Sequence, residues 1–258
     1  MDRAFKETFS ERWERYFTGA EQPLVFYYTD REDRAEKAKA PPGWQCVIAV
    51  LNRVRQGTPL SFDVDVIGCG GGKRYLGFVE ELRPNFEYFL SYGIPGELEG
   101  ERYKKSPELV KTIMERMPIF KAPGKFIVFK RWDRIEEGEE PAVVIFFAPP
   151  DVLSGLFTLA NFDEPEPAVY TPFGAGCGTI VQYPFLERTA ARPRAVLGMF
   201  DVSARPCVPA GTLSFAVPWT KFVTMVQNMP ESFLITPSWK NIGTLPYFLR
   251  LIREGSLY

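Results

Sequence analysis

The spacing of apolar and polar residues predicts that short buried strands alternate with amphipathic helices. Aromatic residues recur at every fourth position from Phe5 to Phe17, with charged residues between them, as in an amphipathic helix. Short apolar, β-favouring runs predict strands at 24–29, 60–66, 126–132, 142–148, 168–171, 195–200 and 212–217, and a further one at 86–91. Helical spacing, with caps at Ser106 and Asp151, predicts helices at 44–56, 75–81, 106–117, 151–162, 220–228 and 239–252.

These elements predict an α+β fold, in which helices cover a mixed sheet within a single domain of 1–258. The order of strand, helix, strand and glycine loop occurs twice. The elements at 142–148, 152–160, 168–171 and 174–178 repeat those at 24–29, 44–56, 60–66 and 68–72. We infer an internal pseudo-twofold duplication with halves of roughly 1–135 and 136–258. The alternative is that this order is simply common among mixed folds.

Composition narrows the function classes. With 258 residues, 45% of them hydrophobic, the chain is long enough to bury a substantial core. Its 31 basic and 32 acidic residues give no electrostatic signature of a nucleic-acid or anionic-membrane partner. The chain has no histidine, which excludes Ser-His-Asp and Cys-His catalysis and every His-ligated metal site.

The apolar runs are too short for a membrane span, which needs about 20 residues. The N-terminal pattern is that of an amphipathic helix rather than of a signal peptide. We therefore expect a cytoplasmic protein whose four cysteines are thiols or metal ligands rather than disulfides. The expected partner is a small-molecule ligand, with no nucleic acid and no membrane; the oligomeric state does not follow from the sequence.

Several segments resemble those of the family called domain of unknown function 169, also labelled ArCR. They are Cys46 in the first core helix, GCGGGKRYLGF at 68–78, FFAPPDVLSGLFTLANFD at 146–163, PFGAGC at 172–177, RAVLGMFDVSARP at 194–206 and LSFAVP at 213–218. The resemblance covers most of the chain from about residue 20 onwards. It implies a prokaryotic cytoplasmic protein and brings no established activity.

The two Gly-Cys-Gly loops are the first candidate site. Glycine-rich loops leave backbone amides free to bind an anion, and neither loop has the spacing of a phosphate-binding P-loop or a dinucleotide fingerprint. Arg74 would strengthen such a site, and a tyrosine follows each loop cysteine by six residues. The candidate residues for a small anionic ligand or cofactor are Gly70, Gly71, Gly72, Lys73, Gly176, Gly178 and Arg205. The alternative for either loop is a tight turn.

The cysteines are the second candidate. Cys69 and Cys177 each lie between glycines at an expected helix start, which would lower a thiol pKa and favour a reactive or metal-binding thiolate. With Cys46 as third ligand and Cys207 or another group as fourth, they would hold zinc or an iron-sulfur cluster, although no CxxC pair is present. A thiolate-dependent enzyme without histidine, with Lys73 or Arg205 as partner, is a further alternative.

Overall fold

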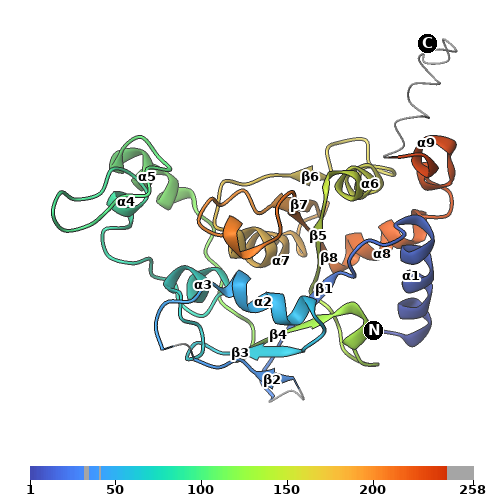
Figure 1. The fold of residues 1–258 in the computed structure, drawn as a ribbon, viewed down its shortest axis with the longest axis horizontal. Coiled ribbons are helices and arrows are strands. Elements are labelled where there is room, and N and C mark those ends of the chain that lie inside the picture. The colour runs from blue at the N-terminus through green and yellow to red at the C-terminus, as the bar shows by residue number, and fades with distance from the viewer. Residues whose placement is uncertain (32–34, 41, 243–258) are drawn as a thin grey trace, which may run out of the picture.

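Eight strands form one continuous mixed sheet in the computed structural model of the chain (Figure 1). The structure describes residues 1–31, 35–40 and 42–242. The strand order is β2-β3-β4-β1-β5-β8-β7-β6, so β1 and β5 form the centre. The strands are β1 (Leu24–Thr29), β2 (Glu36–Lys37), β3 (Leu60–Phe62), β4 (Phe126–Arg131), β5 (Val143–Ala148), β6 (Val169–Tyr170), β7 (Ala195–Gly198) and β8 (Leu213–Pro218). The predicted α+β fold with a mixed sheet is confirmed.

Helices cover both faces of this sheet. The α-helices are α1 (Arg3–Tyr16), α2 (Val47–Arg55), α3 (Gly70–Tyr75), α4 (Phe86–Phe89), α5 (Pro107–Arg116), α6 (Pro150–Ala160), α7 (Tyr183–Glu187), α8 (Trp219–Asn228) and α9 (Pro237–Lys240). Shorter turns of helix are η1 (Trp132–Arg134), the π-helix η2 (Gly178–Gln182), η3 (Arg205–Cys207) and η4 (Phe233–Ile235). In Figure 1, α1, α6 and α8 lie on one side of the central strands, and α2, α3 and α7 on the other.

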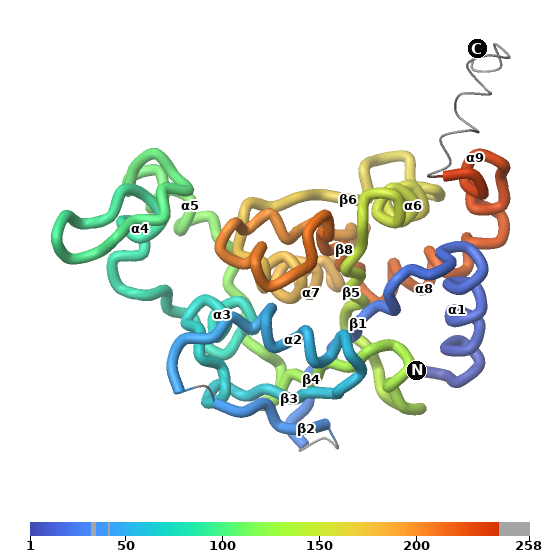
Figure 2. Tube along the Cα trace, viewed as in Figure 1, coloured from blue at the N-terminus to red at the C-terminus, as the bar shows by residue number. Residues whose placement is uncertain are grey.

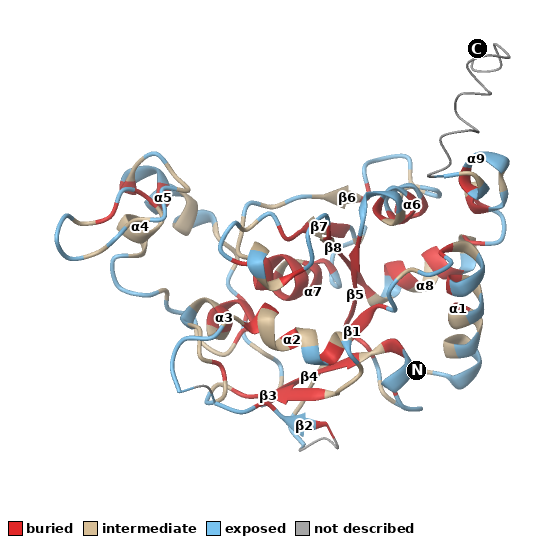
Figure 3. Ribbon diagram, in the orientation of Figure 1, coloured by how far each residue is buried: buried red, intermediate tan, exposed pale blue. Residues whose placement is uncertain are grey.

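The central strands are apolar on both faces because each face is covered. In β1, Leu24 and Phe26 pack into the core beneath α2, while Val25 points into the core beneath α1. The buried residues therefore concentrate in these strands and on the sheet-facing sides of the helices (Figure 3). None of the helices within the described residues is long and apolar enough to cross a membrane.

A helical excursion, carrying α4 and α5, projects away from the sheet (Figure 2). The Tyr103 hydroxyl lies 2.5 Å from Ser203 Oγ, and Lys104 Nζ lies 3.6 Å from the centre of the Phe173 ring. These contacts attach the excursion to the segments that follow β6 and β7.

The two halves of the sheet have corresponding arrangements. In the first half, β4 pairs antiparallel with both β1 and β3. In the second half, β8 pairs antiparallel with both β5 and β7. The edge pairs β2·β3 and β6·β7 are both parallel. The registers also correspond: Leu24 faces Arg131 as Val143 faces Pro218, and Leu60 faces Phe129 as Val196 faces Ala216. In this correspondence α2 matches η2 and α7, because each lies between the two strands of a parallel edge pair.

The repeat as drawn from the sequence is therefore wrong in its matching of elements. It paired the strand at 60–66 with the strand at 168–171. In the sheet order, however, β3 is equivalent to β7, each being second from an edge, and β2 is equivalent to β6, each being an edge strand. It also paired the helix at 44–56 with α6. The duplication itself stays a prediction.

Three local predictions are also corrected. The segment at 86–91 contains the helix α4 (Phe86–Phe89) followed by a turn, with Asn85 in the left-handed region at φ 58°, so a short aromatic run did not become a strand. The helix expected at 75–81 instead spans Gly70–Tyr75. Asp151 lies in the first turn of α6 and Pro149 is the cap. Of the helix expected at 239–252, the part from 243 onwards lies outside the described residues.

Candidate functional site

The structure brings the two Gly-Cys-Gly segments together at α3 and η2 (Figure 1). A Cβ on Gly178 would lie 3.0 Å from Cδ1 of Tyr75, and a Cβ on Gly72 would lie 2.8 Å from Cγ2 of Val47. A side chain at either position would push α3 away from η2 or α2. Gly72 and Gly178 therefore allow close packing between segments. The sequence analysis considered ligand binding or a tight turn for these loops, and not this packing role.

All four cysteines lie at the ends of elements around this contact. Cys46 caps α2, Cys69 caps α3, Cys177 precedes η2 and Cys207 ends η3. Cys69 Sγ accepts a hydrogen bond from the Gly72 amide at 3.4 Å. Cys46 interacts electrostatically with Cys207, and Cys177 with Cys69 and Cys46. All four are free thiols.

The thiol environment differs from the sequence-based expectation. Burial raises the pKa of the Cys177 thiol well above its ordinary value, and the neighbouring Cys69 and Cys46 raise it further. The predicted lowering of this pKa is therefore wrong, because the side chain is enclosed in the core rather than exposed at a helix start. Burial also raises the pKa of Cys46 to about 11, and Cys207 adds to that effect.

No group of three or more Cys, Asp or Glu side chains within the described ranges is arranged to hold a metal ion. The assignment of Cys46, Cys69 and Cys177 as metal ligands stays a prediction.

Arg74 is a buried cation at this site. Its side chain is 4% exposed, Nη1 donates to the Glu80 carbonyl oxygen, and Nε has no hydrogen-bond partner. It forms no ion pair with any residue that the structure describes. Two tyrosines lie near its charge: burial raises the pKa of both Tyr75 and Tyr183, and Arg74 partly opposes this rise. Arg74 therefore lies near two phenol groups without a direct ion pair among the described residues, and the Asp201 carboxylate also acts on Tyr75.

The other predicted ligand-binding residues have different environments. Gly70 and Gly71 begin α3, and the space around a Cβ on Gly70 is open. Lys73 is half-buried on the same helix. The Gly176 amide donates to Asp201 Oδ2 at 3.0 Å and is therefore already used within the protein.

Arg205 closes its own turn, since its guanidinium donates to the carbonyl oxygens of Thr212 and Pro209. Its role as an anion clamp stays a prediction, although these bonds hold the side chain to the backbone. The sequence analysis did not predict that Tyr75 and Tyr183 lie near the charge of Arg74. The tyrosine six residues after each loop cysteine was the signal that could have found them.

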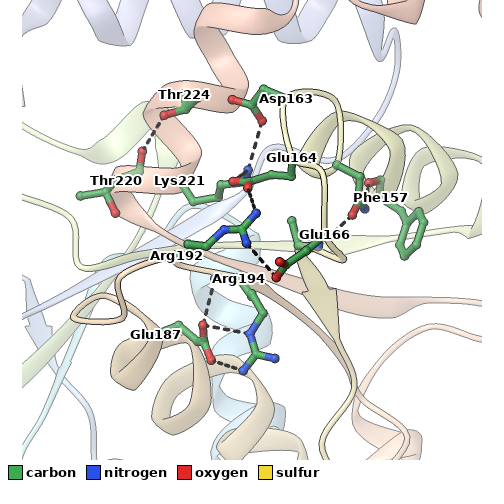
Figure 4. A network of polar contacts seen from close by, with 12 residues as sticks. Phe157, Asp163, Glu164, Glu166, Glu187, Arg192, Arg194, Thr220, Lys221 and Thr224 are labelled. Carbon is green, nitrogen blue, oxygen red and sulfur yellow. Dashed lines mark hydrogen bonds and ion pairs between the residues drawn. The ribbon is translucent and has the colours of Figure 1, made fainter.

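A second charged cluster, away from the cysteines, has its charges paired (Figure 4). The buried Lys221 Nζ lies 2.8 Å from Glu164 Oε1 and 3.2 Å from Asp163 Oδ1. Arg192 pairs with Glu164 and Glu166, and Arg194 pairs with Glu187 at 2.7 Å. This network connects α8, α7 and the loops beside β6 and β7. Because its positive and negative side chains pair with one another, this network has a structural role. Arg74, in contrast, has no ion pair among the described residues.

Two cavities of the protein lie away from this cluster. One of about 670 Å³ lies between α1 and the α9 region, lined among others by Tyr16, Phe147 and Trp239, and another of about 430 Å³ lies beside Lys6 and Glu136. Neither is lined by a cysteine or by Arg74. A ligand at the candidate site would therefore bind outside these two cavities.

Comparison with known protein families gives a match over most of the chain. The family described as uncharacterised ArCR, domain of unknown function 169, matches residues 16–228, a range that includes all four cysteines and Arg74. No curated protein and no solved structure matches the chain.

Proposed function

We propose that this chain, which belongs to the uncharacterised ArCR family, domain of unknown function 169, binds a small anionic ligand or cofactor between its two Gly-Cys-Gly segments, with Arg74 as the counter-ion. The supporting observation is the burial of the Arg74 guanidinium without an anionic partner among the described residues. Removing a charge from water is unfavourable unless it is paired. A ligand carboxylate or phosphate would supply that pairing.

The donors left on Arg74 suit such a group. Nη1 already donates to a carbonyl, whereas Nε is unsatisfied. An arginine fork presents parallel donors that match two oxygens of a carboxylate or phosphate. Lys73 on the same helix would add a second positive charge.

The surrounding thiols do not repel an anion. The raised pKa values of Cys46 and Cys177 keep both side chains protonated and neutral at pH 7. The same shift disfavours Cys177 as the nucleophile of a thiolate-dependent enzyme, and we propose no reaction for this site.

The sheet registers support the inferred duplication with a revised matching. Each of Cys46 and Cys177 immediately precedes the helix that lies between the strands of a parallel edge pair. The antiparallel pairing of β1 with β5 would lie on the pseudo-twofold axis. We infer that the ligand site lies where the two related halves meet.

Titration with inorganic phosphate and with succinate, followed by thermal unfolding, tests this proposal. A ligand at about 100 times its Kd adds about 2.7 kcal/mol of apparent stability. We expect the melting temperature to rise for the natural chain and for Arg116→Met, an exposed-arginine control, and to stay constant for Arg74→Met. An equal rise in Arg74→Met would contradict the role of Arg74, and no rise in any protein would contradict binding of both probes.

A thiolate-bound metal is the second candidate function. It is supported by the electrostatic interactions of Cys177 with Cys69 and Cys46, and of Cys46 with Cys207. Sulfur ligands select zinc or an iron-sulfur cluster. Because these side chains are not arranged for a metal in this structure, binding would require them to move together. Anaerobic purification with iron, zinc and sulfide analysis tests it: stoichiometric metal that is lost in Cys46→Ser supports the site, and metal-free protein contradicts it.

A further inference from the structure

Cys46 and Cys207 interact electrostatically and pack against the same hydrophobic core, although they come from opposite halves of the chain. Cys46 caps α2, and Cys207 is the last residue of η3. Both are free and half-buried, and both pack at the edge of the same hydrophobic core. We propose that Cys46 and Cys207 form a reversible disulfide bond that links α2 to η3.

The backbone around the pair is already held in place. Asn52, on α2, donates from Nδ2 to the Cys207 carbonyl oxygen at 3.0 Å. This bond fixes η3 against α2 independently of the thiols. A disulfide needs closely placed Cα atoms and a sulfur separation of about 2 Å. Because η3 is already attached to α2, a disulfide between Cys46 and Cys207 does not require separate elements to dock.

The other two cysteines are less suited to this reaction. Cys177 is buried, which limits access by an oxidant. Cys69 interacts electrostatically with Cys177, so its neighbouring thiol is the buried one. By contrast, Trp44, two residues before Cys46, is 70% exposed, so this end of α2 faces solvent.

The oxidant is a small-molecule disulfide such as glutathione disulfide. The Cys207 thiolate attacks one sulfur of the oxidant, forms a mixed disulfide and releases one glutathione thiolate. The second cysteine of the pair loses its proton and attacks the bound sulfur of the first. The second glutathione then leaves, and the released protons reside on the two glutathione thiols. The protein pair is oxidised by two electrons and the oxidant is reduced by two.

The bond would change the candidate site without depending on the anionic ligand. Cys46 interacts electrostatically with Cys177, so oxidation removes one thiol from the surroundings of Cys177 and fastens η3 to the start of α2. Cys46 in the disulfide could no longer act as a metal ligand. The two proposals fail separately, since the disulfide test contains no anion probe and no metal.

Peptide mass spectrometry after glutathione disulfide treatment tests the proposal on the full chain. We expect the natural chain to lose two thiols together and to yield one linked peptide containing Cys46 and Cys207. Dithiothreitol should restore all four thiols. The yield should not change on tenfold dilution of the protein, because the bond is intramolecular.

Single variants provide the matched controls. Cys69→Ser should still give the Cys46–Cys207 link, whereas Cys46→Ser should give no internal link and at most one glutathione on Cys207. Four unreacted thiols in the natural chain, or a link between any other pair, would overturn the proposal. Because the natural chain carries the main result, poor folding of a variant does not remove the test.

Discussion

Gly178 lies directly against the ring of Tyr75: a Cβ at position 178 would stand 3.0 Å from Tyr75 Cδ1. These residues belong to different Gly-Cys-Gly segments, one beginning η2 and the other ending α3. Their contact is what allows Cys177 to share its surroundings with Cys69. The absence of a side chain at 178 thus matters for tertiary packing.

Gly178→Ala should destabilise the protein by about 1–3 kcal/mol, the usual cost of overpacking a core. Gly70→Ala is the matched control, because the space around that Cβ is open. Its effect should stay within about 0.5 kcal/mol. Urea unfolding followed by circular dichroism measures both, and equal effects would show that the Gly178 contact is not tight.

Gly155→Ala tests whether local propensity or packing dominates in α6. Within a helix, alanine is favoured over glycine by about 1 kcal/mol. A Cβ on Gly155 would, however, lie 2.3 Å from Trp239 Cη2 and 2.8 Å from Phe17 Cε1. We expect net destabilisation of about 1–3 kcal/mol in thermal or urea unfolding. The exposed neighbour Ser154→Ala should be neutral or stabilising, and a stabilised Gly155→Ala would refute the packing argument.

Cys177 should be the slowest of the four thiols to react with iodoacetamide in the native protein at pH 8. Burial raises its pKa and also blocks access. Timed alkylation with peptide mass spectrometry would show Cys177 unmodified while the half-buried cysteines react, with all four modified in urea. Labelling of Cys177 at the rate of the others would show that it opens to solvent.

Glu164 should make stability depend on acid pH. The hydrogen bond from Lys221 lowers the pKa of this carboxyl below its ordinary 4.5. A lowered folded-state pKa contributes stability above the unfolded value, and this contribution is lost as pH falls below 4.5 through the folded-state value. In Glu164→Gln, the free energy of unfolding should fall less steeply with acid in that window. An exposed-site control, Glu14→Gln, should retain the natural slope, and an unchanged slope in Glu164→Gln would contradict the pairing.

Local pattern was sufficient where a segment's burial follows from its own residues. β1 and β5 lie where apolar runs predicted strands, and α5 begins where Ser106 and Pro107 predicted a helix start. Pattern failed at 86–91, because a short aromatic run is compatible with either a strand or a helix. It also failed at Gly70–Tyr75, where contacts with Val47 and Gly178 support a helix that glycine propensity disfavours.

The sequence by itself determined the composition of the two Gly-Cys-Gly segments, the absence of histidine, and the apolar faces of strands and helices that pack together in an α+β fold. Tertiary structure decided that Cys46 meets Cys207, that Cys177 is enclosed, and that Arg74 rather than Arg205 is the buried cation without a described anionic partner. The reason is physical. The secondary structure of a segment depends largely on nearby residues, whereas burial and the pairing of charges and thiols depend on residues brought together only by the sheet and the helices that cover it.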